Sequence, residues 1–258
     1  MKKLLAFALA ATLAMAFNAP ALALDRAAVA AARRDLQSAV NQGDPAALAS
    51  VRARFAAMSQ AEPGDALLHY WVAVASWRAL PLQRDKKLAE RMGDDALEHL
   101  EKALIAEPKF AEALAVKGGI QGMLISYKPG AMMTLGPQSG ANLGRAVSLQ
   151  PDNPRIHLLA GVGKFHTPAA FGGGAKSAVE EFRRAQELFA KESVADSTAP
   201  DWGRDDACLW EGRAAMQMKD YAAARDAYRL ALTANPANGW VRTTLLPAAE
   251  QALAGREK

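Results

Sequence analysis

The sequence predicts an all-α protein in which antiparallel helix pairs stack into a right-handed solenoid. Alanine, leucine and charged residues recur with a helical period, and no segment combines two-residue alternation with enrichment in β-branched residues. Clusters of Pro, Gly, Asn and Asp divide the chain into segments of helix length. One pattern of residues recurs at an interval of roughly 43 residues, as in helical repeat proteins. We therefore expect essentially no sheet.

Residues 1–23 have the features of a signal peptide. Two lysines precede an apolar stretch at 4–17, and Ala21-Leu22-Ala23 provides a small-x-small cleavage site. The stretch is shorter than the roughly 20 residues that span a bilayer, and Pro20 interrupts its continuation. Cleavage is thus favoured over an uncleaved anchor. We expect a mature chain without an integral membrane segment, periplasmic or secreted.

Charge and cysteine content exclude several classes of protein. The formal charge of +4 falls by two when Lys2 and Lys3 are removed, which is too little for the basic surface that nucleic acid requires. We therefore expect no nucleic-acid partner. Cys208 is the single cysteine, so it cannot form an internal disulfide, and none stands at the cleavage site for lipid attachment. We interpret it as a small buried side chain, with a reactive or intermolecular thiol as the alternative.

Turn signals place the helices within a single domain, residues 24–258. Residues 24–63 are expected to form a degenerate N-terminal pair, whose second helix begins at Asp44-Pro45. Residues 239–258 are expected to form a capping helix, which covers the last apolar face of a solenoid. The repeat units between them are predicted at 64–108, 109–151, 152–190 and 200–236.

The last unit carries the most specific pattern, with Gly212, Ala224, Tyr228, Ala231 and Pro236 at fixed offsets. A small residue lets the first helix approach its partner closely, the alanine and the aromatic fill the contact, and proline ends the unit. The pattern resembles the tetratricopeptide repeat (TPR) signature, which implies a TPR-like solenoid. Partial copies occur at Ala96, Leu100, Ala103 and Pro108, at Leu143, Ala146 and Pro151, and at Ala178, Phe182 and Ala185.

The interval of roughly 43 residues exceeds the roughly 34 of a plain TPR. We expect the additional residues in enlarged loops between the two helices of a unit, at 81–91, 127–136 and 167–174. A HEAT-type array has a period in this range and is the alternative fold. It would not place alanine, aromatic, alanine and proline at these offsets.

Two further motifs narrow the resemblance. A Phe-Gly-Gly turn at 171–173 and a Pro-x-Trp-Gly turn at 200–203 precede the final repeat, as in a group of exported bacterial TPR proteins. This resemblance covers roughly residues 150–250 and implies no catalytic residues.

The glycine loop also resembles a phosphate-binding loop, but it does not fit the Walker pattern. Ala175 stands where glycine must precede Lys-Ser, and the preceding segment is helical. What remains is a glycine turn before a helix N-terminus, which could hold an anion. The favoured alternative is an insertion that caps the helix. The possible anion site comprises Gly172, Gly173, Gly174 and Lys176.

First helices line the concave face of a TPR array, and their small residues Ala73, Gly161 and Gly212 set the register of the side chains that point inward. Aromatic, Met and Arg side chains on one surface suit recognition of a peptide. For Tyr70, Trp77 or Phe165 alone, a place in the core is an equal alternative. The predicted groove comprises Tyr70, Val74, Trp77, Arg78, Arg155, Leu158, Phe165, His166, Leu209, Arg213, Met216 and Gln217.

No pattern in the sequence indicates catalysis, a cofactor or a metal. The histidines lack metal-ligand spacing, and no Gly-x-Ser-x-Gly elbow occurs. We expect the acidic pairs at helix starts or on solvated faces, so a hydrolase remains only as an alternative. These pairs are Asp94-Asp95, Glu180-Glu181 and Asp205-Asp206.

The predicted function is therefore that of an exported, non-catalytic scaffold whose groove binds a protein or peptide in the cell envelope. The alternative is an accessory subunit of a tripartite-type solute transporter, in which insertions close the solenoid around a small apolar ligand. A closed apolar pocket would favour the transporter subunit, and an open groove with exposed aromatics would favour the scaffold.

Overall fold

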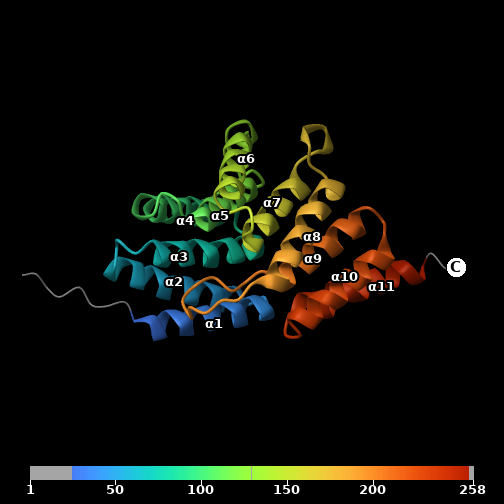
Figure 1. Ribbon diagram of the computed structural model, residues 1–258, viewed down its shortest axis with the longest axis horizontal. Coiled ribbons are helices and arrows are strands. Elements are labelled where there is room, and N and C mark those ends of the chain that lie inside the picture. Colours follow the sequence, from blue (N-terminus) through green and yellow to red (C-terminus); the bar gives the residue numbers. More distant parts are fainter. Residues whose placement is uncertain (1–24, 129, 256–258) are drawn as a thin grey trace, which may run out of the picture.

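The computed structural model describes residues 25–128 and 130–255, and within these ranges the regular structure is helical without strands. The predicted all-α class is thus confirmed, whereas the predicted signal peptide at 1–23 lies outside the described residues. Figure 1 shows the helices in chain order across the molecule. They are α1 (Arg26–Gln42), α2 (Pro45–Ala61), α3 (Ala66–Ala79), α4 (Lys86–Ala106), α5 (Ala111–Leu124), α6 (Met132–Leu149), α7 (Pro154–His166), α8 (Ala175–Lys191), α9 (Arg204–Gln217), α10 (Tyr221–Ala234) and α11 (Leu246–Ala254).

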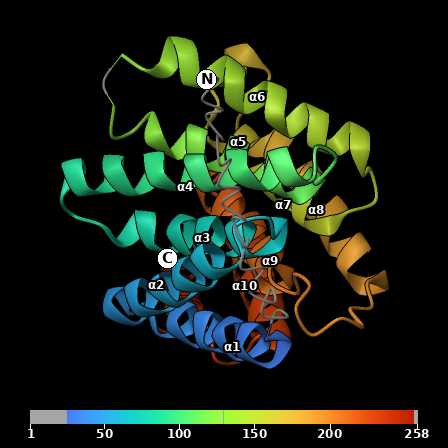
Figure 2. The ribbon, with the colours of Figure 1, turned by 90° about the vertical axis from the view of Figure 1, so that its left-hand side faces the viewer.

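Sequential helices pack against each other as pairs, and the pairs stack. The closest packing is between α5 and α6, α7 and α8, and α9 and α10, while α3 packs equally on α2 and α4, and α5 also packs on α7. Figure 2 shows this layering for α1 to α6. Because the first helices lie between neighbouring pairs, nearly all of α3 is buried, whereas α4 buries only one stripe.

Small residues occupy the contact between the two helices of a pair. A Cβ atom on Gly161 would lie 2.5 Å from the Phe182 ring, and one on Gly212 would lie 2.4 Å from the Tyr228 ring. A Cβ atom on Gly118 would lie 2.8 Å from the Leu143 side chain. The close contacts predicted for Gly161 and Gly212 are thus confirmed, and in the second unit Gly118, not Gly119, takes this position.

Histidines tie the start of two first helices to the preceding turn. One ring nitrogen of His69 and of His157 donates to the carbonyl of the proline six residues earlier, at 3.0 and 2.7 Å. The other ring nitrogen faces the second helix of the unit: His69 meets His99 at 2.8 Å and His157 meets Glu181 at 2.7 Å. These contacts hold the first helix of each pair against the preceding turn and against the second helix.

The additional residues of the repeat lengthen second helices as well as loops. α4 has 21 residues and α6 has 18, whereas α3 and α5 have 14 each. Asp85 caps the N-terminus of α4, since its carboxylate accepts from the Leu88 N–H at 3.1 Å. Parts of the predicted loops 81–91 and 127–136 are therefore helical.

The C-terminal end of the array is covered as a solenoid requires. A π-helical turn, η3 (Val241–Leu245), continues into α11, and both pack on α10. Val241 and Ala249 are buried there.

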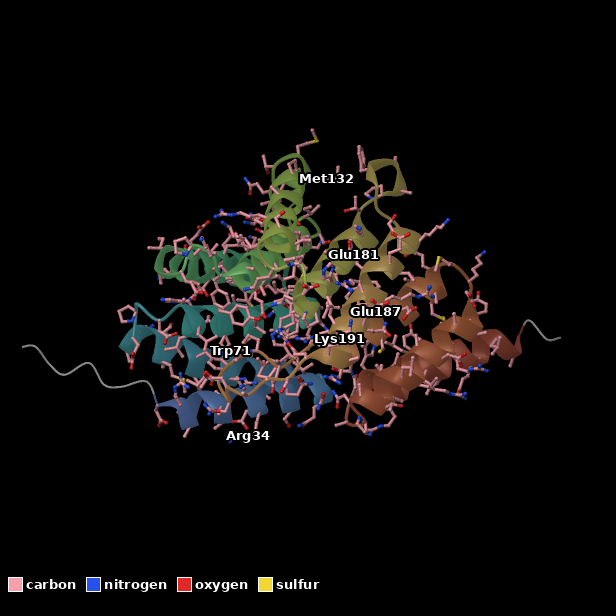
Figure 3. All side chains as sticks on the ribbon, in the orientation of Figure 1. Arg34, Trp71, Met132, Glu181, Glu187 and Lys191 are labelled. Carbon is pink, nitrogen blue, oxygen red and sulfur yellow. The ribbon has the colours of Figure 1, made fainter. Side chains whose placement is uncertain are left out.

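The connection between α8 and α9 is irregular and runs back across the molecule. It leaves α8 after Lys191, reaches the surface of α1 and α3 near Trp71, and returns to α9 (Figures 1 and 3). We call residues 192–203 the strap.

Candidate binding site

The strap lies against α1 and α3. The Trp71 indole donates to the Thr198 carbonyl at 3.1 Å. Arg33 of α1 donates to the Ser197 carbonyl and forms an ion pair with Asp201. The strap is therefore held through its backbone carbonyls as well as its side chains.

Trp202 anchors the end of the strap in the interior. Its indole donates to the Tyr70 hydroxyl at 3.0 Å, and its ring lies 5.3 Å from that of Trp77. The Arg78 guanidinium lies 5.0 Å from the Trp202 ring and 4.5 Å from the Trp77 ring, so it contacts both indoles.

Glu112 of α5 connects the strap's anchor to α7. Its carboxylate accepts from the Tyr70 hydroxyl at 2.8 Å and from Arg155 Nε at 2.9 Å, while Arg155 also pairs with Glu192 of the strap. Burial raises the pKa of Tyr70 well above its usual range, and the Glu112 carboxylate raises it further. The tyrosine thus acts as a neutral hydrogen-bond donor within a fully paired network.

Two carboxylates at the start of α9 also take part in this buried network. Arg78 donates to both oxygens of Asp206, one at 2.9 Å. Asp205 accepts from Asn235 at 2.8 Å, and Asn235 also donates to Asn41 of α1 at 2.8 Å. Burial, and then Asp206, raise the pKa of Asp205. As predicted, this acidic pair lies at a helix start, in the first turn of α9, but both carboxylates are buried and hydrogen-bonded rather than solvated.

The N-terminal part of the predicted groove is therefore closed by the chain itself. The sequence predicted an open groove, because no periodic signal in the strap indicates that it folds back. Because several of the predicted side chains are buried, they are not exposed to a partner, contrary to the prediction. The residues that are buried or nearly so are Tyr70, Val74, Trp77, Arg78, Arg155, Leu158 and Leu209.

The remaining predicted residues lie at an open edge formed by α7, α9 and the residue before η3. We call Phe165, His166, Trp210, Arg213 and Trp240 the aromatic cluster. The Phe165 and Trp210 rings are 5.5 Å apart and nearly perpendicular, and the His166 ring lies 5.7 Å from Trp210. Trp240 is 48% exposed. Met216 and Gln217 follow on α9, partly buried and exposed respectively.

Arg213 is the charged centre of the aromatic cluster. Its guanidinium lies 4.1 Å from the Trp210 ring, 5.5 Å from Phe165 and 5.6 Å from Trp240. Burial lowers the pKa of Arg213. Burial, and then Arg213, lower the pKa of His166, so this imidazole is neutral at neutral pH.

Sequence reasoning missed Trp210 and Trp240. Trp210 directly follows Leu209, one position outside the assigned register, and an aromatic beside a predicted inward residue was the available signal. Trp240 follows the turn at 235–238, where no helical register applies. The fold alone brings it over Arg213.

The glycine loop does not form the predicted anion cradle. The N–H groups of Gly172, Gly173 and Gly174 donate to carbonyls of Ala169, Pro168 and Lys164 within the loop. A Cβ atom on Gly173 would lie 2.2 Å from the Thr167 carbonyl oxygen. The glycines therefore permit a tight turn before α8. Their N–H groups are not available to bind an anion together with the exposed Lys176.

The described residues offer no second site of clear chemistry. They contain no cluster of three or more His, Cys, Asp or Glu side chains suited to a metal, and none of their helices is long and apolar enough to cross a bilayer. Cys208 is buried, and burial raises its pKa to about 12, which disfavours the reactive thiolate. A hollow between α1, α3 and the strap is lined by Trp71, Arg78, Asp201 and Trp202, which are already partnered.

Comparisons with known proteins show the fold. No family model matches the sequence, and no curated protein matches it. The HusA haemophore from Porphyromonas gingivalis is 23% identical with a TM-score of 0.59, covering 72% of this chain and 92% of its own. A thermophilic TPR protein from Thermus thermophilus is 16% identical with a TM-score of 0.59, covering 86% of this chain and 99% of its own. The predicted fold is thus confirmed: the chain is a TPR-like helical solenoid, closed over part of its inner face by its own strap.

Proposed function

We propose that this chain is an exported, non-catalytic scaffold that binds a segment of another cell-envelope protein through the aromatic cluster. The observation that carries the proposal is that Trp240, which is 48% exposed, and Trp210 both lie against the Arg213 guanidinium. Trp and Arg are the residues in which binding energy concentrates at protein interfaces.

The position of the cluster supports the same function. Its members lie on α7, on α9 and directly before η3, whereas the strap contacts α1 and α3 through Ser197, Thr198 and Trp202. An approaching segment would therefore meet rings already held in place by each other and by Arg213. A surface ordered in advance loses less conformational entropy on binding.

The transporter-subunit alternative finds no support in the described residues. It requires an enclosed apolar pocket, and the place for that pocket holds Trp202, Arg78 and their partners. For the hydrolase alternative, the acidic pair that is buried, Asp205 and Asp206, is already hydrogen-bonded in the interior.

Site-specific photo-crosslinking tests the binding function. A crosslinking amino acid replaces Gln217, beside the aromatic cluster, in the full chain expressed in its native envelope; a matched variant replaces Ile105, which is 79% exposed on α4. We expect a discrete protein adduct from position 217 and none from 105. Adding Trp240→Ala should reduce the adduct at least about fivefold.

Circular dichroism of each variant serves as the control for folding. Equal adducts from both positions, or an adduct that survives Trp240→Ala in a fully helical protein, would reject the cluster as the binding surface. Substitution of Arg78 or Arg155 is unsuitable here, because each would leave buried carboxylates unpaired.

Export is tested separately. Cleavage after Ala23 predicts a protein in the envelope fraction whose N-terminal sequence begins at Leu24. Intact-mass measurement of that fraction tests the cleavage, and a full-length mass would contradict it. A protein found only in the cytoplasm would contradict export.

A further inference from the structure

Within the part of the chain that the structure describes, Arg213 differs from the buried arginines and from Arg78 in having no carboxylate partner. Arg78 and Arg155 each pair with carboxylates, and Arg33 pairs with Asp201. Among the described residues no carboxylate lies within ion-pair distance of Arg213, which instead contacts three aromatic rings. Ring faces compensate only part of the cost of removing a cation from water. The guanidinium is therefore available to an anion.

The groups around Arg213 determine which charge on the anion is favoured. His166 is neutral, because burial and Arg213 lower its pKa, so Arg213 carries the full positive charge of the cluster. A planar guanidinium matches the two oxygens of a carboxylate, and an exposed imidazole can donate one more hydrogen bond. One positive charge complements a monoanion better than a dianion such as a phosphate monoester.

The surface around Arg213 is apolar and aromatic. Trp240 is half exposed, and Phe165, Trp210 and Met216 are partly buried. A group bound to the guanidinium would carry its neighbouring atoms onto these rings. Recognition therefore requires both a carboxylate and an adjacent apolar or aromatic side chain.

We propose that the aromatic cluster recognises a carboxylate of the partner protein next to an apolar or aromatic residue, with Arg213 as the counter-ion. This inference rests on the proposed function and specifies the chemistry of the segment that is bound. Arg213 binds the carboxylate, and Trp210 and Trp240 contact its apolar neighbour.

Peptide-display selection tests this specificity even while the partner is unidentified. A random library of short peptides is selected on the immobilised full chain, and enriched sequences are synthesised for anisotropy titration. We expect Asp or Glu beside Phe, Trp, Leu or Met in the enriched set. An enriched peptide should bind Arg213→Gln at least about tenfold more weakly, and the same peptide with Gln in place of Glu should lose affinity similarly.

Arg229→Gln is the matched control, since Arg229 is an exposed arginine that pairs with Glu250 outside the cluster. It should leave affinity unchanged, and Arg213→Lys should bind with intermediate affinity because it keeps the charge but loses the planar contacts. Enrichment without acidic residues, or equal affinity for Arg213→Gln, overturns the carboxylate inference; if those peptides still need Trp240, the proposed function stands. Absence of any enriched peptide counts against both.

Discussion

Glycine at the first-helix contact position exchanges helix propensity for close packing. Gly161 has no space for a Cβ atom, because Phe182 would lie 2.5 Å from it, whereas Gly144 in α6 has no atom within 4 Å. Both are helical, so alanine improves the helix at both positions by up to about 1 kcal/mol. The difference between them therefore measures packing alone.

We predict that Gly161→Ala lowers the free energy of unfolding by about 1–3 kcal/mol and that Gly144→Ala leaves it unchanged or raises it. Urea unfolding followed by circular dichroism measures both. Equal effects of the two substitutions would contradict the close contact between α7 and Phe182.

The His69–His99 contact makes stability depend on pH. Burial lowers the pKa of His99 to about 4; Asp95 opposes this shift, while His69, Lys102 and Arg52 add to it. The folded pKa lies below the usual value of about 6.5, so the unfolded chain binds the proton more readily. The contribution of this group is thus complete above about pH 6.5 and is lost as pH falls towards 4.

His99→Gln removes this titration and keeps an amide that can donate to His69. We predict that the stability of the natural protein relative to this variant decreases by on the order of 1 kcal/mol between pH 7 and pH 4.5, after allowance for the partial exposure of the ring. Urea unfolding at the two pH values provides the measurement. A pH-independent difference would show that His99 is not the responsible group.

The position of the strap depends mainly on the side chain of Trp202. Trp202 is 5% exposed, contacts Trp77 and Arg78, and donates to Tyr70, whereas Trp240 is 48% exposed. Truncation of the buried Trp202 leaves a cavity and removes the hydrogen bond that its indole donates to the Tyr70 hydroxyl, whereas truncation of the exposed Trp240 does neither.

We therefore predict that Trp202→Ala lowers the free energy of unfolding by about 3–5 kcal/mol and Trp240→Ala by less than about 1 kcal/mol. Guanidinium unfolding followed by circular dichroism distinguishes the two. A small effect of Trp202→Ala would mean that the strap is not anchored in the interior.

The helices could be predicted from the sequence because their signals are local. Gly212, Tyr228 and Pro236 act within one pair, and the contact under the Tyr228 ring forms as their spacing implies. The strap could not be predicted, since its partners Arg33 and Trp71 lie more than a hundred residues away and no periodicity links them. The same long-range contacts bury several of the predicted groove residues, which the helical register alone could not indicate.

At the scale of the molecule, the strap connects units that an open solenoid would leave independent. Arg33 joins α1 to Ser197 and Asp201, and Asn41 joins α1 to Asn235 after α10. Stability in an open array is a sum of contacts between neighbours. Here the two ends also stabilise each other.

Amide hydrogen exchange tests this connection. We predict that Arg33→Met speeds exchange throughout α1 by about tenfold or more and leaves α5 and α6 unaffected, because it releases α1 from the strap. Arg34→Met is the matched control, since Arg34 is an exposed neighbour on the outer side of α1 (Figure 3). Equal effects of the two variants would indicate that α1 is held by α2 alone.

The reach of the strap also fixes how many units the array contains. Repeat proteins change length when internal units are duplicated or lost, because each unit contacts only its neighbours. In this chain an additional pair between α2 and α7 would move α1 away from Ser197 and Asn235. Loss of a pair would remove the side chains that Trp202 contacts. The contacts across the array therefore constrain the number of pairs, whereas the residues at the open edge take no part in those contacts.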